Sequence, residues 1–437
     1  MTLPIPDLTD TPLVFHEEGG PASARGFKAV GVHAGFRADP DRLDMALVVA
    51  DEPCAAAATF TTNVFCAAPV RVSREHLSEG GPGAPSYGCA RAVVVNSGIA
   101  NAATGERGLQ AARDTAALVG DAVGCPANEV LVASTGVIGQ HLRLEPFGEG
   151  VPAALAALDA QTDDAAREAG GAQAAWAIMT TDTRPKHLAV SFPGDDFGYP
   201  DTMFTVGGMA KGAGMIMPNM ATMIAVITTD APVAAPDLSA ALTRAVNKSF
   251  NKVTVDSDTS TNDSCFALAS GAAAPGGARF EPGTPAFAGF QQALDVVCMT
   301  LARAMAADGE GATRLITVTV RGAATAEDAD AAARTVANSP LVKTAVYGHD
   351  ANWGRVAAAL GRSGAQFAQE DVDIDILGLP VCRAGLTVPF DEDEALLRFE
   401  QPECAIDVHL HAGDYSTVMW TCDFSHEYVT INGDYRS

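Results

Sequence analysis

Apolar residues follow two different periods along this chain. The β-branched runs Arg91–Val95 and Leu315–Val320 predict strands. From Leu109 to Val123 the apolar positions are spaced three, four, three and four residues apart, which predicts an amphipathic helix. A similar apolar stripe predicts a second helix over Phe287–Met305, ending at Asp308-Gly309. Strands and helices therefore alternate, and the fold class is α/β, or α+β with mixed sheets.

The last third of the chain adds strands with a period of two. Apolar residues alternate with Asp or His over Val372–Ile376 and over Ile406–Leu410, which predicts strands with one solvent-exposed face. The small residues Ala412-Gly413-Asp414 then predict a hairpin that leads into a strand over Tyr415–Cys422.

Composition narrows the range of functions. Of 437 residues, 48% are hydrophobic and 19% charged, which is too apolar for a disordered chain. The net charge is −25, so nucleic acid and anionic membranes are excluded as expected partners. The acidic surface also means that a site for an anionic substrate must supply its own positive charge.

The cysteines and the first ten residues bear on the cellular compartment of the protein. The nine cysteines are scattered without a C-x-x-C pair, which argues against a disulfide framework and for a reducing environment. The residues Met1–Asp10 lack a secretory pattern, and no apolar run approaches the ~20 residues of a membrane-spanning helix. We therefore expect a cytoplasmic protein.

Glycine, hydroxyl and amide residues gather in four segments, each beside an apolar strand pattern. They are Asn96–Gly98, which opens a predicted polar loop to Gly105, Ala133–Gly136, Lys211–Thr222 and Asp256–Asp263. Strand ends are where sites tend to form.

The usual catalytic and metal templates are missing. The sequence holds no P-loop, no G-x-S-x-G and no H-E-x-x-H. The run Asp256–Asp263 lacks the Gly and Glu of an EF-hand, so we interpret its side chains as satisfying a tight backbone. His409 and His411 are interpreted as a solvated strand face, and no metal site is expected.

The segment from Gly212 to Thr222 carries a distinct chemical possibility. Its glycines and Pro218 predict a strained loop, and a buried strand is predicted over Met223–Ile227. A threonine at that position can attack the preceding carbonyl, cut the chain, and then use its own freed α-amino group as a base. A plain entrance to a buried strand explains the same residues, so both interpretations stay open on spacing alone.

Longer segments resemble the ornithine acetyltransferase family, also called glutamate N-acetyltransferase or ArgJ. The similar segments, in the family's order, are RGFKAVGVHAG (25–35), TFTTN (59–63), VVVNSGIANAATG (93–105), ASTGVIG (133–139), IMTTDTRPK (178–186), KGAGMIMPNMATM (211–223), SFNKVTVDSDTSTNDS (249–264), DGEGATRLI (308–316), NSPLVKTA (338–345), GHDANWGRVA (348–357) and YVTINGDYRS (428–437). The resemblance covers nearly the whole chain.

The resemblance implies a chain that cuts itself between Ala221 and Thr222. An alpha chain, 1–221, and a beta chain, 222–437, would then share one intertwined αββα core similar to that of the aminopeptidase DmpA. Two copies of each chain would form a heterotetramer.

The implied reaction moves an acetyl group from N2-acetyl-L-ornithine to L-glutamate in arginine biosynthesis. It is ping-pong, through an acetyl ester. No metal or organic cofactor is implied, and some members of the family also accept acetyl-CoA as donor. The partners are therefore small-molecule substrates.

The family's site residues map onto positions of this chain. Thr222 matches the nucleophile, and Thr135 with Gly136 matches the oxyanion hole. The matching substrate-contacting positions are Thr180, Lys211, Thr222, Glu310, Asn432 and Ser437. From charge alone we infer that Lys211 holds the α-carboxylate and that Glu310 pairs with the ornithine ammonium.

Some residues depart from the family pattern, and two other functions remain as alternatives. Met217, Gly433 and Ser437 stand where the family often has His, Ala and Thr. The roles of Asn96, Asn101, Asp350, Asn352 and Arg355 are left open between building and supporting the site. The alternatives are a DmpA-type aminopeptidase or amidase, in which water takes the acyl group, and an uncleaved, non-catalytic homologue.

Overall fold

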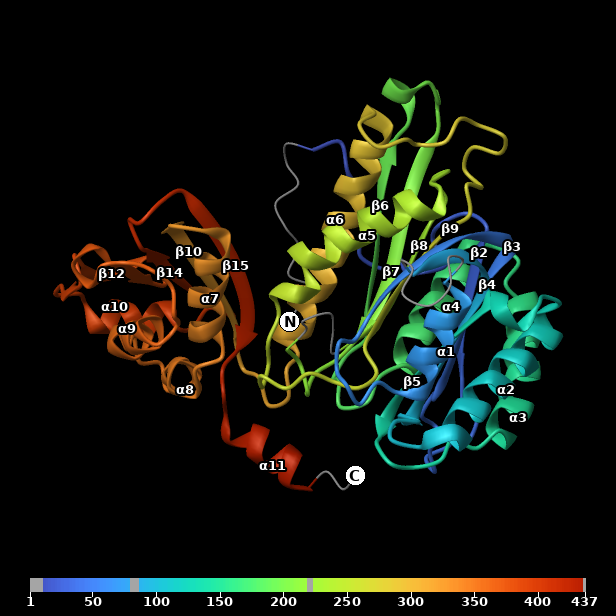
Figure 1. The fold of residues 1–437 in the computed structure, drawn as a ribbon, viewed down its shortest axis with the longest axis horizontal. Coiled ribbons are helices and arrows are strands. Elements are labelled where there is room, and N and C mark those ends of the chain that lie inside the picture. Colours follow the sequence, from blue (N-terminus) through green and yellow to red (C-terminus); the bar gives the residue numbers. More distant parts are fainter. Residues whose placement is uncertain (1–10, 79–85, 218–222, 435–437) are drawn as a thin grey trace.

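The computed structural model describes residues 11–78, 86–217 and 223–434, which fold into a larger and a smaller lobe (Figure 1). The strands of the larger lobe are β1 (Val14–His16), β2 (Phe27–Val32), β3 (Met45–Phe60), β4 (Tyr87–Ile99), β5 (Val130–Val137), β6 (Lys186–Pro193), β7 (Met203–Lys211), β8 (Ile224–Thr229) and β9 (Ser264–Ala269). They form one sheet in the order β1-β6-β7-β8-β9-β3-β4-β5, and β2 pairs with β3.

The long strand β3 divides this sheet into two halves. Its first part, Met45–Ala50, pairs with β2, and its last part, Ala55–Phe60, pairs along the same edge with β9. Side chains from β7, β8 and β9 then share a buried cluster with side chains from β3, β4 and β5. The two halves therefore face each other across a central apolar layer, and α4 (Asp164–Ala177) contributes to that layer.

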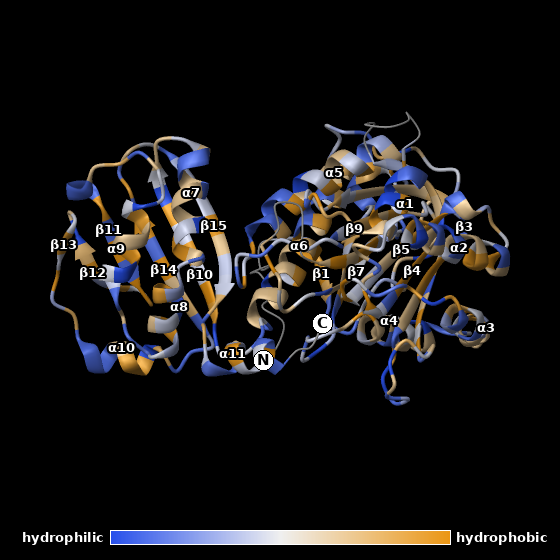
Figure 2. Ribbon diagram, turned by 60° about the horizontal axis from the view of Figure 1, so that its bottom comes forward, coloured by the Kyte–Doolittle hydropathy of each residue, from blue (hydrophilic) through white to orange (hydrophobic). Residues whose placement is uncertain are grey.

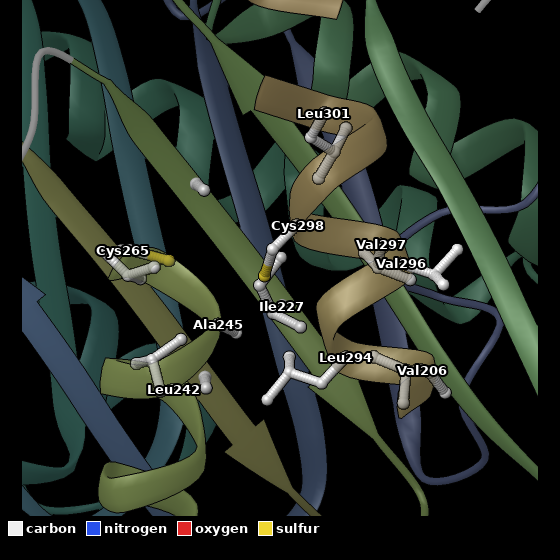
Figure 3. Close-up of a cluster of buried hydrophobic side chains, with 14 of the residues drawn as sticks. Val206, Ile227, Leu242, Ala245, Cys265, Leu294, Val296, Val297, Cys298 and Leu301 are labelled. Carbon is white, nitrogen blue, oxygen red and sulfur yellow. The ribbon is translucent and has the colours of Figure 1, made fainter. Parts of the chain in front are cut away.

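Helices cover both outer faces of the facing half-sheets. On one side, α5 (Ala235–Lys248) and α6 (Pro285–Ala307) pack on β6 to β9. Figure 3 shows this contact, with Leu242, Ala245, Leu294, Val296, Val297, Cys298 and Leu301 beside Val206, Ile227 and Cys265. On the other side, α2 (Gly105–Val123) and α3 (Glu145–Asp159) pack on β2 to β5 (Figure 1). This is the αββα arrangement that the family resemblance implies, and α2 and α6 confirm the two helices predicted from apolar spacing.

The smaller lobe is a mixed sheet with helices against one face. Its strands run in the order β13 (Leu386–Thr387), β12 (Leu379–Arg383), β11 (Asp373–Ile376), β14 (Glu403–His409), β10 (Leu315–Ala323) and β15 (Tyr415–Cys422). Its helices are α7 (Ala326–Ala337), α8 (Pro340–Tyr347), α9 (Trp353–Gly361) and α10 (Glu392–Arg398). Apolar side chains of these helices and of the sheet form one buried cluster, and Figure 2 shows apolar residues in both. Buried and half-buried residues alternate along β11 and β14, which confirms the predicted one-sided strands.

The predicted hairpin at Ala412–Asp414 is wrong. β10 lies between β14 and β15, paired parallel to the first and antiparallel to the second. The backbone N–H groups of Ala412 and Gly413 donate to the carbonyl oxygen of Gly322, 2.7 and 3.0 Å away, at the end of β10. The connection therefore crosses over the end of β10 instead of folding back on its own strand.

The remaining helices are α1 (Ala68–His76) and α11 (His426–Asp434). After β15 the chain leaves the smaller lobe, and Figure 2 shows α11 between the two lobes. Within the described ranges, no helix has both the length and the apolar character needed to cross a membrane.

Candidate functional site

One cavity brings together six residues that the sequence analysis singled out. It has a volume of about 160 Å³ and is lined by Ala100, Thr135, Gly136, Ile138, Thr180, Thr181, Lys211, Gly214, Met215, Ser260, Thr261, Asn262, Glu310 and Asn432. These residues lie in β5 and β7, in α11, and in loops next to β4, β5, β6, β7, β9 and α6. Ala221, Thr222 and Ser437 lie outside the described residues.

Thr135 and Gly136 lie inside strand β5, close against β4. The two strands are parallel, with Ser97 opposite Thr135 and Gly98 opposite Gly136. Gly136 has φ +129°, and a Cβ built there would lie 2.3 Å from the backbone carbonyl carbon of Gly98. Only glycine fits this position, because a side chain would force the two strands apart.

A buried amide network holds this wall of the cavity. Asn262 Nδ2 donates to the carbonyl oxygens of Ala100 and Ser134, 2.6 and 2.8 Å away. Ser134 Oγ donates to Asn96 Oδ1 at 2.6 Å. Asn96 therefore supports the wall without lining the cavity, and it lies in β4, so the loop predicted from Asn96 is wrong up to Ile99. Its amide compensates for the polar backbone buried at the strand end.

Lys211 and Glu310 supply opposite charges to the cavity. Both side chains are almost fully buried. Burial lowers the pKa of Lys211, and the nearby carboxylates of Asp182 and Glu310 partly oppose that shift. The carboxyl group of Glu310 lies against Gly214, where a Cβ would come within 2.4 Å of it, and accepts a hydrogen bond from Asn432 Nδ2 at 2.7 Å. The acidic chain therefore places a buried cation beside a buried anion.

The segment after Lys211 is strained, as the sequence predicts. Met215 has φ +54°, an uncommon conformation for a non-glycine residue. Asp256 accepts hydrogen bonds from the backbone N–H groups of Met215 and Ile216, at 2.6 and 2.8 Å. Thr259 Oγ1 donates to the carbonyl oxygen of Met217 at 2.9 Å. The interpretation of Asp256–Asp263 as a loop that satisfies tight backbone is thus confirmed.

α11 reaches the same region through Tyr428, whose hydroxyl group lies near the carboxylates of Asp256 and Glu310. Burial and the charges of Asp256 and Glu310 raise the pKa of Tyr428, so its hydroxyl stays protonated. Tyr428 was not expected from the sequence, since a lone tyrosine in a terminal helix gives no signal of this contact.

The roles of Asp350, Asn352 and Arg355 were left open by the sequence, and none of the three lines the cavity. Asn352 caps α9 by accepting from the backbone N–H of Arg355 at 3.1 Å, and it donates to Asp350 at 2.9 Å. Arg355 donates to the carbonyl oxygen of Leu341 at 2.7 Å. Asn101 Nδ2 likewise donates to the carbonyl oxygen of Gly108, in the first turn of α2. All four residues support secondary structure.

Asp182 organises the Lys211 side of the cavity, and the sequence analysis did not single it out. Its carboxylate accepts from the backbone N–H groups of Thr180 and Gly212, at 3.1 and 2.6 Å. Burial alone would raise its pKa, but the ammonium groups of Lys186 and Lys211 and the hydrogen bond from Gly212 outweigh burial and lower it. Asp182 thereby connects Thr180, which lines the cavity, to Gly212, the residue that follows Lys211. Within the described ranges, no group of three or more His, Cys, Asp or Glu side chains is arranged to hold a metal ion.

Three comparisons show which known proteins this chain is similar to. The ArgJ family model matches residues 28–437. The arginine biosynthesis bifunctional protein ArgJ of Symbiobacterium thermophilum is 46% identical over 420 residues, or 96% of this chain and 99% of that protein. The protein of the same name from Dehalococcoides mccartyi is 44% identical over 428 residues, with 96% and 98% covered. A solved ornithine acetyltransferase from Mycobacterium tuberculosis, complexed with ornithine, is 38% identical with a TM-score of 0.41, covering 48% of this chain and 100% of that one.

The close approach at Gly136 leads to a stability prediction with a built-in control. Gly139 also has a positive φ, +83°, but a Cβ there meets nothing within 4 Å. Gly139→Ala should therefore lower the free energy of unfolding only by the cost of a left-handed backbone at alanine, about 1–2 kcal/mol. Gly136→Ala adds a clash with Gly98, and we expect it to lower the free energy of unfolding by about 2 kcal/mol more. Denaturant titrations of both variants measure the difference, and equal losses would contradict the packing described for β4 and β5.

Proposed function

The chain belongs to the ArgJ family, and on that premise we propose that it transfers an acetyl group from N2-acetyl-L-ornithine to L-glutamate. Relatives that match 96% of the chain are named bifunctional proteins of arginine biosynthesis. The single observation that carries the proposal is the cavity itself, which combines a buried cation, a buried anion and the Thr135–Gly136 strand. A zwitterionic amino acid requires both charges, and acyl transfer requires oxyanion donors.

The first step is self-cleavage at Thr222. Its hydroxyl oxygen attacks the carbonyl carbon of Ala221, the C–N bond breaks, and the acyl group moves from nitrogen to oxygen. Water then hydrolyses the ester and frees both the hydroxyl and the α-amino group. The strained backbone at Met215 supports this step, since distortion stored in a loop lowers the cost of deforming a nearby peptide bond.

The two resulting chains, 1–221 and 222–437, remain together through the sheet. β7 belongs to the first chain and β8 to the second, and they pair antiparallel from Val206–Thr229 to Lys211–Ile224. β8 also pairs with β9, which pairs in turn with β3 of the first chain. The cut therefore falls in the connection between two paired strands, and the apolar layers on both sides of the sheet stay intact.

Acetyl transfer then takes place in two halves. The freed amine of Thr222 takes the proton of its hydroxyl, which attacks the acetyl carbon of the donor, and ornithine leaves. Glutamate attacks the resulting ester and departs as N-acetylglutamate. Thr135 Oγ1 and the N–H of Gly136 stabilise the oxyanion in both halves, and losing one such donor typically costs about 2.7–4 kcal/mol. Lys211 binds the α-carboxylate, Glu310 the ornithine ammonium, and Thr180, Asn432 and Ser437 complete the site.

The proposal also covers the second donor, the cofactor requirement and the assembly of the chains. Acetyl-CoA serves as a second donor, consistent with the bifunctional name of the relatives. The chemistry uses no metal or organic cofactor, because the N-terminal amine and the backbone supply the base and the oxyanion donors. Two copies of each chain form a cytoplasmic heterotetramer that acts on small molecules, with neither nucleic acid nor membrane as partner.

A donor panel tests this function. The mature protein is incubated with glutamate and either N2-acetyl-L-ornithine or acetyl-CoA, and the products are quantified by mass spectrometry. We expect N-acetylglutamate and ornithine in equal amounts from the first donor. Free acetate in place of N-acetylglutamate would show a hydrolase of the aminopeptidase type, and no turnover with either donor would contradict the proposal.

Self-cleavage predicts two fragments, one beginning Thr-Met-Ile-Ala. Thr222→Ala removes the attacking hydroxyl, so we expect a single species near 44.9 kDa and no transfer. Thr222→Ser keeps a hydroxyl and should still cleave. Intact-mass spectrometry reads out all three proteins, and a Thr222→Ala protein that still splits would eliminate Thr222 as the nucleophile.

The assignment of Glu310 predicts a selective loss. Glu310→Gln keeps an oxygen that can accept from Asn432 but removes the charge that faces the ornithine ammonium. A lost charged hydrogen bond is worth about 1.5–3 kcal/mol, so we expect kcat/KM for acetylornithine to fall by about 10- to 150-fold. With acetyl-CoA as donor the loss should be much smaller, since that donor has no such ammonium. Equal losses with both donors would refute the pairing.

A further inference from the structure

A buried lysine outside the cavity connects the two halves of the site. Lys186, at the start of β6, is completely buried. Its Nζ lies 2.7 Å from Asp182 Oδ1 and 2.5 Å from Asp308 Oδ2, and the carbonyl oxygen of Arg184 is 3.5 Å away. The three protons of the ammonium group thus each have an acceptor. Burying an ammonium group away from water is unfavourable, and the two carboxylates together offset that cost.

The first carboxylate fixes the Lys211 side of the cavity. Asp182 Oδ1 accepts from the backbone N–H of Gly212 at 2.6 Å, and Asp182 Oδ2 lies 3.8 Å from Lys211 Nζ. Gly212 has φ +149°, so the bond is made where the chain turns out of β7. The position of Lys211 therefore depends on where Asp182 is held.

The second carboxylate fixes the Glu310 side. Asp308 is the C-cap residue of α6, and its carboxylate accepts from the backbone N–H of Thr183 at 3.1 Å. Glu310 follows two residues later, and its backbone N–H donates to the carbonyl oxygen of Ala213 at 2.8 Å. Two links therefore join the Lys211 segment to the Glu310 segment: this backbone bond, and the ionic chain Asp182–Lys186–Asp308.

We propose that Lys186 is a positioning residue that sets the spacing between Lys211 and Glu310 and thereby selects the side-chain length of the donor. The inference rests on the proposed function, in which Lys211 takes the α-carboxylate and Glu310 the distal ammonium. After cleavage, Lys186 and Asp182 belong to chain 1–221 and Asp308 to chain 222–437. The ionic chain then holds two separate polypeptides in register at the substrate.

The Asp182 carboxylate of the ionic chain is ionised near neutral pH. The charges of Lys186 and Lys211 outweigh burial and lower the pKa of Asp182, so its carboxylate stays ionised when its unfolded counterpart begins to take up protons. Its stabilisation is present above the unfolded pKa and is lost only as the pH falls through the lower folded value. A change in donor selectivity near neutral pH therefore reports on geometry and not on protonation of Asp182.

The test compares donors that differ by one methylene. kcat/KM is measured with N2-acetyl-L-ornithine, N2-acetyl-L-lysine and N2-acetyl-L-2,4-diaminobutyrate, for the wild type and for Lys186→Met. One methylene is typically worth about 10- to 200-fold in discrimination, which is what we expect of the wild type. In Lys186→Met the preference for acetylornithine should shrink by about tenfold or more, because the two carboxylates separate.

The controls decide between positioning and general damage. Lys28→Met is the matched substitution, since Lys28 Nζ donates to the carbonyl oxygen of Leu158 at 3.1 Å and does not line the cavity. It should leave the donor ratios unchanged. Where Lys186→Met does not mature, Asp308→Asn decides, since it removes the same ion pair from the other chain while keeping an oxygen for Thr183.

Each outcome bears on a separate claim. Rates that fall equally for all three donors, in whichever variant matures, would overturn the positioning role, because a purely structural lysine lowers all of them together. A wild type that uses none of the donors would instead overturn the proposed function. A loss of donor discrimination confined to Lys186→Met or Asp308→Asn supports the inference.

Discussion

The antiparallel pairing of β7 with β8 constrains everything else in this molecule. Both strands lie in the interior of the large sheet with apolar layers on either side, so neither can shift without breaking both layers. Lys211 ends the first strand and Ile224 begins the second, opposite each other. In the connection between them, Gly214 and Met215 line the same cavity as Lys211 and Glu310. The cut proposed at Thr222 would fall in this connection and leave the paired strands whole.

Electrostatics explains why the cavity is built from buried groups. The chain carries a net charge of −25, and an exposed lysine on such a surface would be screened by salt and surrounded by carboxylates. Burial removes that screening and makes each charge more effective toward a substrate. Burial also removes the hydration of each charge, which is unfavourable. The ion pairs of Lys186 with Asp182 and Asp308 offset that loss. Lys211, which lines the cavity, and the ion pairs behind it are thus parts of one network.

Much of the fold follows from local sequence, and the exceptions have physical causes. The apolar spacing over 109–123 and Phe287–Met305 predicts α2 and α6, because each helix buries one face in a sheet. The predicted hairpin after His409 is wrong because β10, a strand distant in sequence, lies between β14 and β15 and pairs with both. Asn96 is polar and yet lies in β4, since Ser134 and the carbonyl oxygen of Ile99 satisfy its side chain. Asp182 gives no local signal, because its partner Gly212 is thirty residues away.

The site residues themselves were predicted through a family resemblance and not from spacing, and six of them line one cavity. The account depends on Thr222 carrying the acetyl group between the two substrates. The most direct measurement incubates the mature protein with N2-acetyl-L-ornithine without an acceptor and weighs both fragments by mass spectrometry. The account predicts that the fragment beginning at Thr222 gains the mass of one acetyl group and returns to its original mass when glutamate is added. An acetyl group that appears on the other fragment, or on neither while ornithine is released, would contradict it.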